Sequence, residues 1–148
     1  MKAVLVHHAE AMMPYEDPQR PLTPLGHRQA EWLAEQAKAA GIVPAAIWHS
    51  GKLRSRQTAE PFLRLCNPMA SFTMVRGLNP GDDASVICDA LLRETRDILL
   101  VGHRPHIYDL QRSMAPERPL FPTHGMIVLE FDDEKATWRE LWRVRPQM

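Results

Sequence analysis

Two adjacent histidines follow a short apolar run at the start of the chain. Residues 3–6 read Ala-Val-Leu-Val and lead directly into His7 and His8, and a second apolar run, residues 97–102, leads into His103 in the same way. Runs of this length, partly β-branched, are typical of buried strands in an α/β sheet. Ligands of such sheets bind beyond the carboxyl ends of parallel strands. Histidine at that position can act as a nucleophile, an acid or base, or a metal ligand.

A third run adds positive charge to the same predicted edge. Residues 45–49 form a strand-like run that is followed by Ser50 and then by Arg54 and Arg56. If these strands are parallel neighbours, imidazoles, guanidinium groups and a helix N-terminus converge on one rim, which is an anion pocket. A phosphoryl group fits best, because the planar guanidinium matches its oxygens and histidine can attack phosphorus. The pattern therefore predicts phosphoryl chemistry.

The elements that must position these residues alternate along the chain. The predicted strands are residues 2–7, 45–49, 71–76 and 97–102, and helical patterns lie between them. Thr23 is a candidate N-cap with Pro24 in the first turn, and Asp83 is a candidate cap of a later helix. The alternation predicts a mainly parallel sheet with right-handed crossovers.

The end of the chain has a different pattern. Two strand-like runs, residues 126–131 and 137–144, flank the polar segment 132–135, which predicts an antiparallel hairpin. The expected fold class is therefore α/β, a three-layer α/β/α sandwich with a mixed sheet. The prolines concentrate in two further segments, which predicts irregular loops at about 11–22 and 115–124.

Length and composition exclude several functional classes. The 148 residues predict a single domain, 1–148, and the 18 basic and 18 acidic residues leave no net field that would attract nucleic acid or an anionic membrane. Two cysteines are too few for a disulfide framework. No apolar run approaches the roughly 20 residues of a membrane span. We therefore expect a cytoplasmic protein.

Four motifs, in order, resemble the histidine phosphatase superfamily, which has the phosphoglycerate mutase-like fold. These motifs are His8 after the first strand, Thr23-Pro24-Leu25-Gly26-His27-Arg28-Gln29-Ala30, Ser50-Gly51-Lys52-Leu53-Arg54-Ser55-Arg56-Gln57-Thr58-Ala59, and Val101-Gly102-His103. The short chain and the segment 78–83 are similar to the SixA-type protein phosphohistidine phosphatases, a small bacterial branch. The resemblance extends to Thr123-His124-Gly125 before the hairpin.

The resemblance implies roles for individual residues. His8 would be the nucleophile that becomes phosphorylated, Arg54 would bind the phosphoryl oxygens, and His103 would stabilise the transition state. Asp82 or Asp83 would be the acid or base, with the spacing slightly in favour of Asp83. His124 is a further candidate for substrate binding, from its place near the predicted rim. The resemblance implies no metal and no organic cofactor.

The first strand departs from the family pattern. The family has Arg-His-Gly where this chain has His7-His8-Ala9. A histidine is shorter than arginine, offers at most one donor within reach, and is charged only part of the time near neutral pH. We expect His7 to line the substrate pocket, with apparent affinity weakening through about pH 6–7.5 if its protonated form holds substrate. Arg56 and Arg104 are candidates to supply the missing charge.

The sequence is compatible with three functions. The favoured one is hydrolysis of phosphohistidine on a partner protein such as a histidine-phosphotransfer domain, because an imidazole leaves more easily than an alkoxide and needs less acid help. The second is hydrolysis of small phosphorylated metabolites at the same site. The third is a non-catalytic module that binds phosphate or a phosphoprotein and lost turnover with the arginine.

Overall fold

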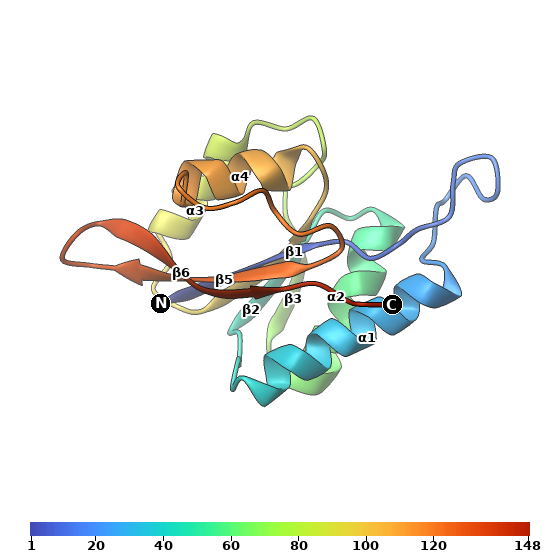
Figure 1. Cartoon of the computed structure of the whole chain (residues 1–148), viewed down its shortest axis with the longest axis horizontal. Helices are drawn as coiled ribbons and strands as arrows, with labels where there is room; N and C mark the ends of the chain where they lie inside the picture. The colour runs from blue at the N-terminus through green and yellow to red at the C-terminus, as the bar shows by residue number, and fades with distance from the viewer.

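A single six-stranded sheet with helices on both faces forms the frame of the molecule. The structure is a computed structural model that describes residues 1–148. The elements in chain order are β1 (Lys2–His7), α1 (Pro24–Ala39), β2 (Ala46–His49), α2 (Leu53–Cys66), β3 (Ser71–Met74), α3 (Ala84–Leu92), β4 (Ile98–Gly102), α4 (His106–Met114), β5 (Met126–Asp132) and β6 (Thr137–Val144). Helices α3 and α4 cover one face of the sheet, and α1 and α2 cover the other (Figure 1).

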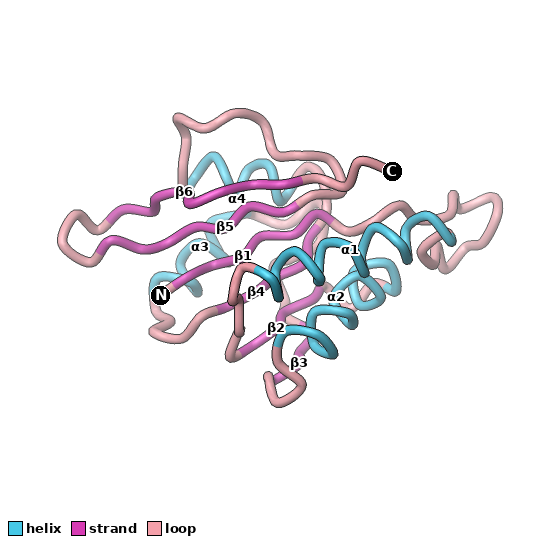
Figure 2. The backbone as a smooth tube through the Cα atoms, turned by 60° about the horizontal axis from the view of Figure 1, so that its bottom comes forward, coloured by secondary structure: helices cyan, strands magenta, loops and turns pink.

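The sheet order is β3-β2-β4-β1-β5-β6. The first four of these strands pair in parallel, whereas β5 pairs antiparallel with both β1 and β6. Figure 2 shows the strands side by side, with β1 in the middle of the sheet. The predicted α/β sandwich with its C-terminal hairpin is therefore confirmed. The parallel register pairs His7 with Gly102, which brings the ends of β1 and β4 to one edge.

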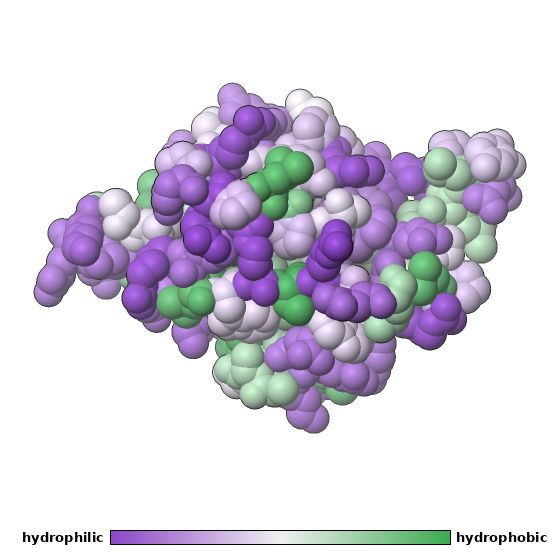
Figure 3. Space-filling view, in the orientation of Figure 1, coloured by the Kyte–Doolittle hydropathy of each residue, from purple (hydrophilic) through white to green (hydrophobic).

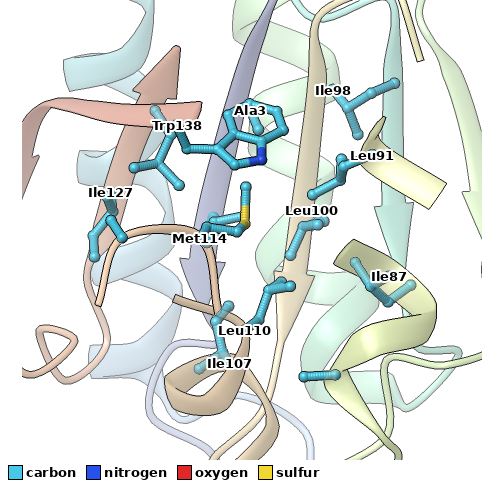
Figure 4. Close-up of a cluster of buried hydrophobic side chains, with 14 of the residues drawn as sticks. Ala3, Ile87, Leu91, Ile98, Leu100, Ile107, Leu110, Met114, Ile127 and Trp138 are labelled. Carbon is cyan, nitrogen blue, oxygen red and sulfur yellow. The ribbon is translucent and has the colours of Figure 1, made fainter. Parts of the chain in front are cut away.

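Alternation along β1 divides the core into two layers. Ala3 and Leu5 belong to the buried cluster beneath α3 and α4, whereas Val4 and Val6 belong to the cluster beneath α1 and α2. This is the two-residue period of a strand buried on both faces. Figure 4 shows the first cluster, in which side chains of α4 lie between those of α3 and the hairpin. None of the helices is long and apolar enough to cross a membrane.

Local capping signals explain where the helices begin. The Thr23 hydroxyl accepts a hydrogen bond from the Gly26 N–H at 2.9 Å, and Pro24 opens α1 as predicted. The Asp83 carboxylate caps α3 by accepting from the Ser85 N–H. The boundaries differ slightly from expectation elsewhere. Strand β3 ends at Met74 rather than at residue 76. Helix α4 begins at His106, with Pro105 at its N-cap position.

Candidate active site

A pocket of about 450 Å³ opens at the carboxyl ends of β1 and β4. Its lining residues come from five separate parts of the chain: His7, His8, Glu10, Ala11, Met13, Arg20, Arg54, Pro80, His103, Arg104 and His124. The predicted residues His7, His8, Arg54, His103 and His124 are all among them. Sequence segments more than a hundred residues apart thus meet around one concavity, as the parallel strand ends predicted.

Asp83 is not among the lining residues. Its side chain is exposed and its carboxylate accepts a hydrogen bond from Ser85, which lowers the pKa of Asp83. The Asp82 carboxylate accepts from the Asn79 N–H in the preceding turn. Both candidate acids therefore serve local structure, although Pro80 of the same segment does line the pocket.

His8 has one ring nitrogen engaged by the backbone. Its Nδ1 lies 2.7 Å from the Ala9 carbonyl oxygen. Because a carbonyl can only accept, Nδ1 carries the proton and Nε2 carries the lone pair. Burial, together with Arg54 and His124, lowers the pKa of His8 to about 3, although the bond to Ala9 opposes this shift. His8 is therefore a neutral imidazole near neutral pH, with Nε2 available as a nucleophile.

His7 and His124 form a hydrogen-bonded, stacked pair. The His124 N–H donates to His7 Nδ1 at 2.8 Å, so the proton of the neutral His7 ring sits on Nε2. The two rings stack with centroids 5.0 Å apart and planes 9° apart. Burial, with repulsion from His8, lowers the pKa of His7 to about 2. The expected titration of His7 through about pH 6–7.5 is therefore absent in the free protein, where His7 offers one neutral donor.

His103 and Arg54 each present a nitrogen without a partner in the protein. His103 Nε2 lies 2.6 Å from the Ser50 hydroxyl, whereas His103 Nδ1 and Arg54 Nε are buried and make no hydrogen bond. Burial, with repulsion from His8, lowers the pKa of His103 to about 2, and burial also lowers the pKa of Arg54. Buried polar nitrogens are nearly always hydrogen-bonded in proteins. Two such atoms in residues of one pocket fit an anionic ligand.

Helix α2 positions Arg54 through two polar side chains for which the sequence predicted no role. The Ser55 hydroxyl donates to the Val101 carbonyl of β4 at 2.9 Å, and Thr58 accepts from the Ala9 N–H at 3.0 Å. Both side chains are fully buried. Their spacing of three residues, within the apolar face that includes Ala59, is the signal that marks them as inward-facing. They fix α2 to the strand ends that carry His8 and His103.

Arg20 is a further pocket residue that the sequence did not reveal. It lines the pocket from the loop after β1, and its Nε donates to the Met12 carbonyl at 2.8 Å. Its backbone has a positive φ of 50°, which non-glycine residues rarely adopt. Arg104 also lines the pocket, as one of the two candidates to replace the missing arginine, whereas Arg56 does not. Arg56 instead pairs with Glu60 on the exposed side of α2.

The described residues contain no group of three or more histidine, cysteine, aspartate or glutamate side chains arranged to hold a metal ion. The imidazoles in the pocket are instead held by backbone groups, by the Ser50 hydroxyl and by stacking of His7 on His124. The site combines a neutral imidazole with a free lone pair, a guanidinium, and buried nitrogens of Arg54 and His103 that have no partner in the protein. This is the arrangement that covalent phosphoryl transfer needs.

Comparison with known proteins identifies the family. Residues 3–79 match the family model described as histidine phosphatase superfamily (branch 1), and the chain belongs to this superfamily. It is thus in the phosphatase class of hydrolases. A search of curated proteins found no match.

Solved structures with the same fold include several phosphatases. The protein histidine phosphatase SixA complexed with tungstate is 23% identical, with a TM-score of 0.87 over 99% of this chain and 97% of that one. A putative phosphohistidine phosphatase SixA from Agrobacterium tumefaciens is 26% identical, with a TM-score of 0.80 over 98% and 97% of the two chains. A phosphoserine phosphatase mutant from Entamoeba histolytica is 15% identical, with a TM-score of 0.71 over 96% and 95%.

Proposed function

We propose that this chain, as one domain, hydrolyses phosphoryl groups through a covalent phosphohistidine on His8, and that its substrate is phosphohistidine on a partner protein. The observation that carries the proposal is the state of His8. Its Nδ1–H donates to the Ala9 carbonyl, which leaves the lone pair on Nε2. His8 lines the pocket together with Arg54 and His103. The same backbone carbonyl stabilises the positive charge that develops on the ring when Nε2 attacks phosphorus.

The reaction proceeds in two displacements. In the first, His8 Nε2 forms a bond to phosphorus while the bond to the leaving group breaks. The Ser50 hydroxyl accepts from the Lys52 N–H and gives its own proton to His103 Nε2, which leaves the ring proton of His103 on Nδ1. Arg54 Nε and His103 Nδ1 then donate to the phosphoryl oxygens, and the His7 Nε2–H supplies a third, neutral donor. In the second, water attacks phosphorus and the electron pair of the N–P bond returns to His8. Catalysis comes mainly from positioning and from charge stabilisation.

Two features favour a protein as the substrate. The loop after β1 projects from the body of the molecule (Figure 1), and its Met13 and Arg20 line the pocket. Met13 and Tyr15 in this loop have exposed fractions of 49% and 86%. In the space-filling view this loop stands out at one end with apolar and polar residues mixed (Figure 3). Exposed aromatic and methionine side chains are enriched in protein contacts. The solved SixA structures with this fold also bear the name phosphohistidine phosphatase.

The free cysteines Cys66 and Cys88 fit a reducing compartment, so we assign the activity to the cytoplasm.

The test uses a phosphorylated histidine-phosphotransfer domain carrying labelled phosphate. The wild-type protein is expected to release the label as inorganic phosphate, and His8→Asn is expected to release none, because the asparagine amide cannot attack phosphorus. Acid quenching and alkaline quenching of the wild-type reaction distinguish the acid-labile N–P bond of the intermediate. His27→Asn on the exposed face of α1 is the matched control and should retain full activity.

The remaining outcomes identify the alternatives. Turnover of phosphoserine or sugar phosphates without loss of label from the protein would assign a small-molecule phosphomonoesterase. Saturable binding of vanadate without turnover of any substrate would assign a binding module. Equal release of label by wild type and His8→Asn would contradict the proposal itself.

A further inference from the structure

The two displacements leave the source of the proton for the leaving group unassigned. Asp83 caps α3 and is not among the residues that line the pocket. Arginine does not give up its proton in proteins. Among the remaining lining residues, Glu10 and His124 can both exchange a proton. The Glu10 carboxylate accepts from the Thr23 hydroxyl at 3.2 Å, at the N-terminus of α1.

His124 is held with one ring nitrogen fixed and the other free. Its Nδ1 lies 2.8 Å from the His8 carbonyl oxygen, so Nδ1 is a donor and its proton is committed to that bond. No protein partner engages Nε2 in the hydrogen bonds of the site. The ring is half-buried, so it can exchange protons with solvent.

The backbone at His124 is strained in a way that keeps this geometry. Its φ is +54°, in the left-handed region, and its N–H donates to His7. Non-glycine residues in this region cost of order 1–3 kcal/mol and persist where the surroundings demand them. The centroid of the His124 ring lies 5.0 Å from that of His7 and 6.2 Å from that of His8. His124 and His8 line the same pocket, so a group bound there lies beside both rings.

We infer that His124 is the acid and base of the reaction, an inference that rests on the proposed function. In the first displacement the His124 imidazolium gives its Nε2 proton to the leaving atom as the bond to phosphorus breaks. In the second, the neutral His124 Nε2 takes a proton from water as the water oxygen bonds to phosphorus and the N–P bond breaks. His124 ends the cycle protonated again, and phosphate is released.

The test is the dependence of kcat/KM on the leaving group in His124→Gly. Glycine accepts the positive φ and retains the backbone N–H that holds His7, so only the imidazole is lost. kcat/KM reports steps up to release of the leaving group. We expect a loss of about 100-fold on phosphoserine, whose alkoxide needs a proton, and a loss below about 3-fold on p-nitrophenyl phosphate, whose phenolate does not.

A second measurement follows the other half of the cycle. Without a base for water, His124→Gly is expected to accumulate phosphorylated His8 and to show a burst of p-nitrophenol. Added imidazole should restore turnover of phosphoserine by occupying the space of the lost ring. The controls are Glu10→Gln, which tests the other proton carrier in the pocket, and Ala136→Gly, which makes the same backbone change at a positive φ in the distant β5–β6 turn.

Outcomes separate this inference from the proposed function. If His124→Gly loses activity equally on both substrates, its ring only positions His8, and the inference is wrong while the phosphatase assignment stands. If Glu10→Gln alone shows the dependence on the leaving group, the acid is Glu10. If wild type acts on neither small substrate, the same comparison is made on phosphorylated protein against phosphoramidate, and failure there as well overturns the proposed function.

Discussion

At residue 7 the chain has histidine where the family pattern has arginine. The side chain is 1% exposed and lines the pocket. Its one neutral donor replaces two charged ones, because burial keeps the pKa of His7 at about 2. Arg20 and Arg104 line the same pocket, so positive charge approaches from the loop after β1 and from the end of β4 instead.

Restoring the arginine is expected to strengthen phosphate binding. His7→Arg adds a charged, forked donor to the pocket lining. Loss of transition-state donors of this kind costs on the order of 10²–10³ in rate. Part of that gain is offset, because His124 N–H loses its acceptor. We expect vanadate to bind about 10-fold more tightly and kcat/KM to rise by a similar factor.

The matched control for this substitution is His7→Gln. Its amide oxygen can accept from His124 and its NH₂ group can donate to phosphate, so it retains the neutral pattern and should behave like wild type. Vanadate titration and steady-state kinetics of the three proteins make the comparison. Equal vanadate affinity in His7→Arg and His7→Gln would show that charge at this position is not what the site lacks.

At the scale of elements, the site depends on how closely α1 approaches the segment after His8. Thr23 N–H donates to the Glu10 carbonyl at 3.0 Å, and the Gln29 side chain accepts from the Glu10 N–H at 2.9 Å. Gly26 faces the same backbone, and a Cβ there would lie 2.0 Å from the Glu10 oxygen. The glycine of the Thr23–Gly26 motif is thus required by a contact between backbones rather than by a turn.

Gly26→Ala is therefore expected to push the Glu10 segment away from α1. Overpacking of this kind typically costs about 1–3 kcal/mol in the free energy of unfolding, and here it should also lower kcat because His8 is two residues from Glu10. Urea denaturation and turnover of p-nitrophenyl phosphate measure the two effects. Gly81→Ala is the control, since a Cβ there meets nothing within 4 Å. Similar stability in the two variants would contradict the close approach.

Elements with a local signal were predictable, and contacts made by loops were not. Helices α1 and α3 begin where Thr23 and Asp83 place their caps, and β1 shows its burial in an unbroken apolar run. The meeting of His8 with His103 followed from the parallel order of strands. Arg20 gave no such signal, because its place in the pocket depends on an irregular loop and a positive φ. The spacing that favoured Asp83 as an acid could not distinguish a catalytic carboxylate from a helix cap.

At the scale of the whole molecule, burying several neutral histidines makes folding sensitive to acid. Burial lowers the pKa of His7 and of His103 to about 2 and that of His8 to about 3, whereas the unfolded chain protonates each near 6.5. Between these values the unfolded state binds more protons than the folded state. The stability contributed by the neutral rings is therefore complete above about pH 6.5 and is lost as pH falls below it.

The free energy of unfolding should accordingly fall steeply between about pH 7 and pH 5, with each of the three histidines adding up to about 1.4 kcal/mol per pH unit at the acid end. This window lies above the range in which carboxylates titrate, so the slope isolates the histidines. Urea denaturation in phosphate-free buffer at a series of pH values measures this slope.

In His7→Gln one titrating group is gone, and the slope should decrease by about one proton equivalent whatever the variant's absolute stability. Vanadate, which binds the folded state, should raise stability throughout the window. A slope that is unchanged in His7→Gln would mean that His7 is protonated in the folded protein, and the neutral donor assigned to it in the pocket would have to be abandoned.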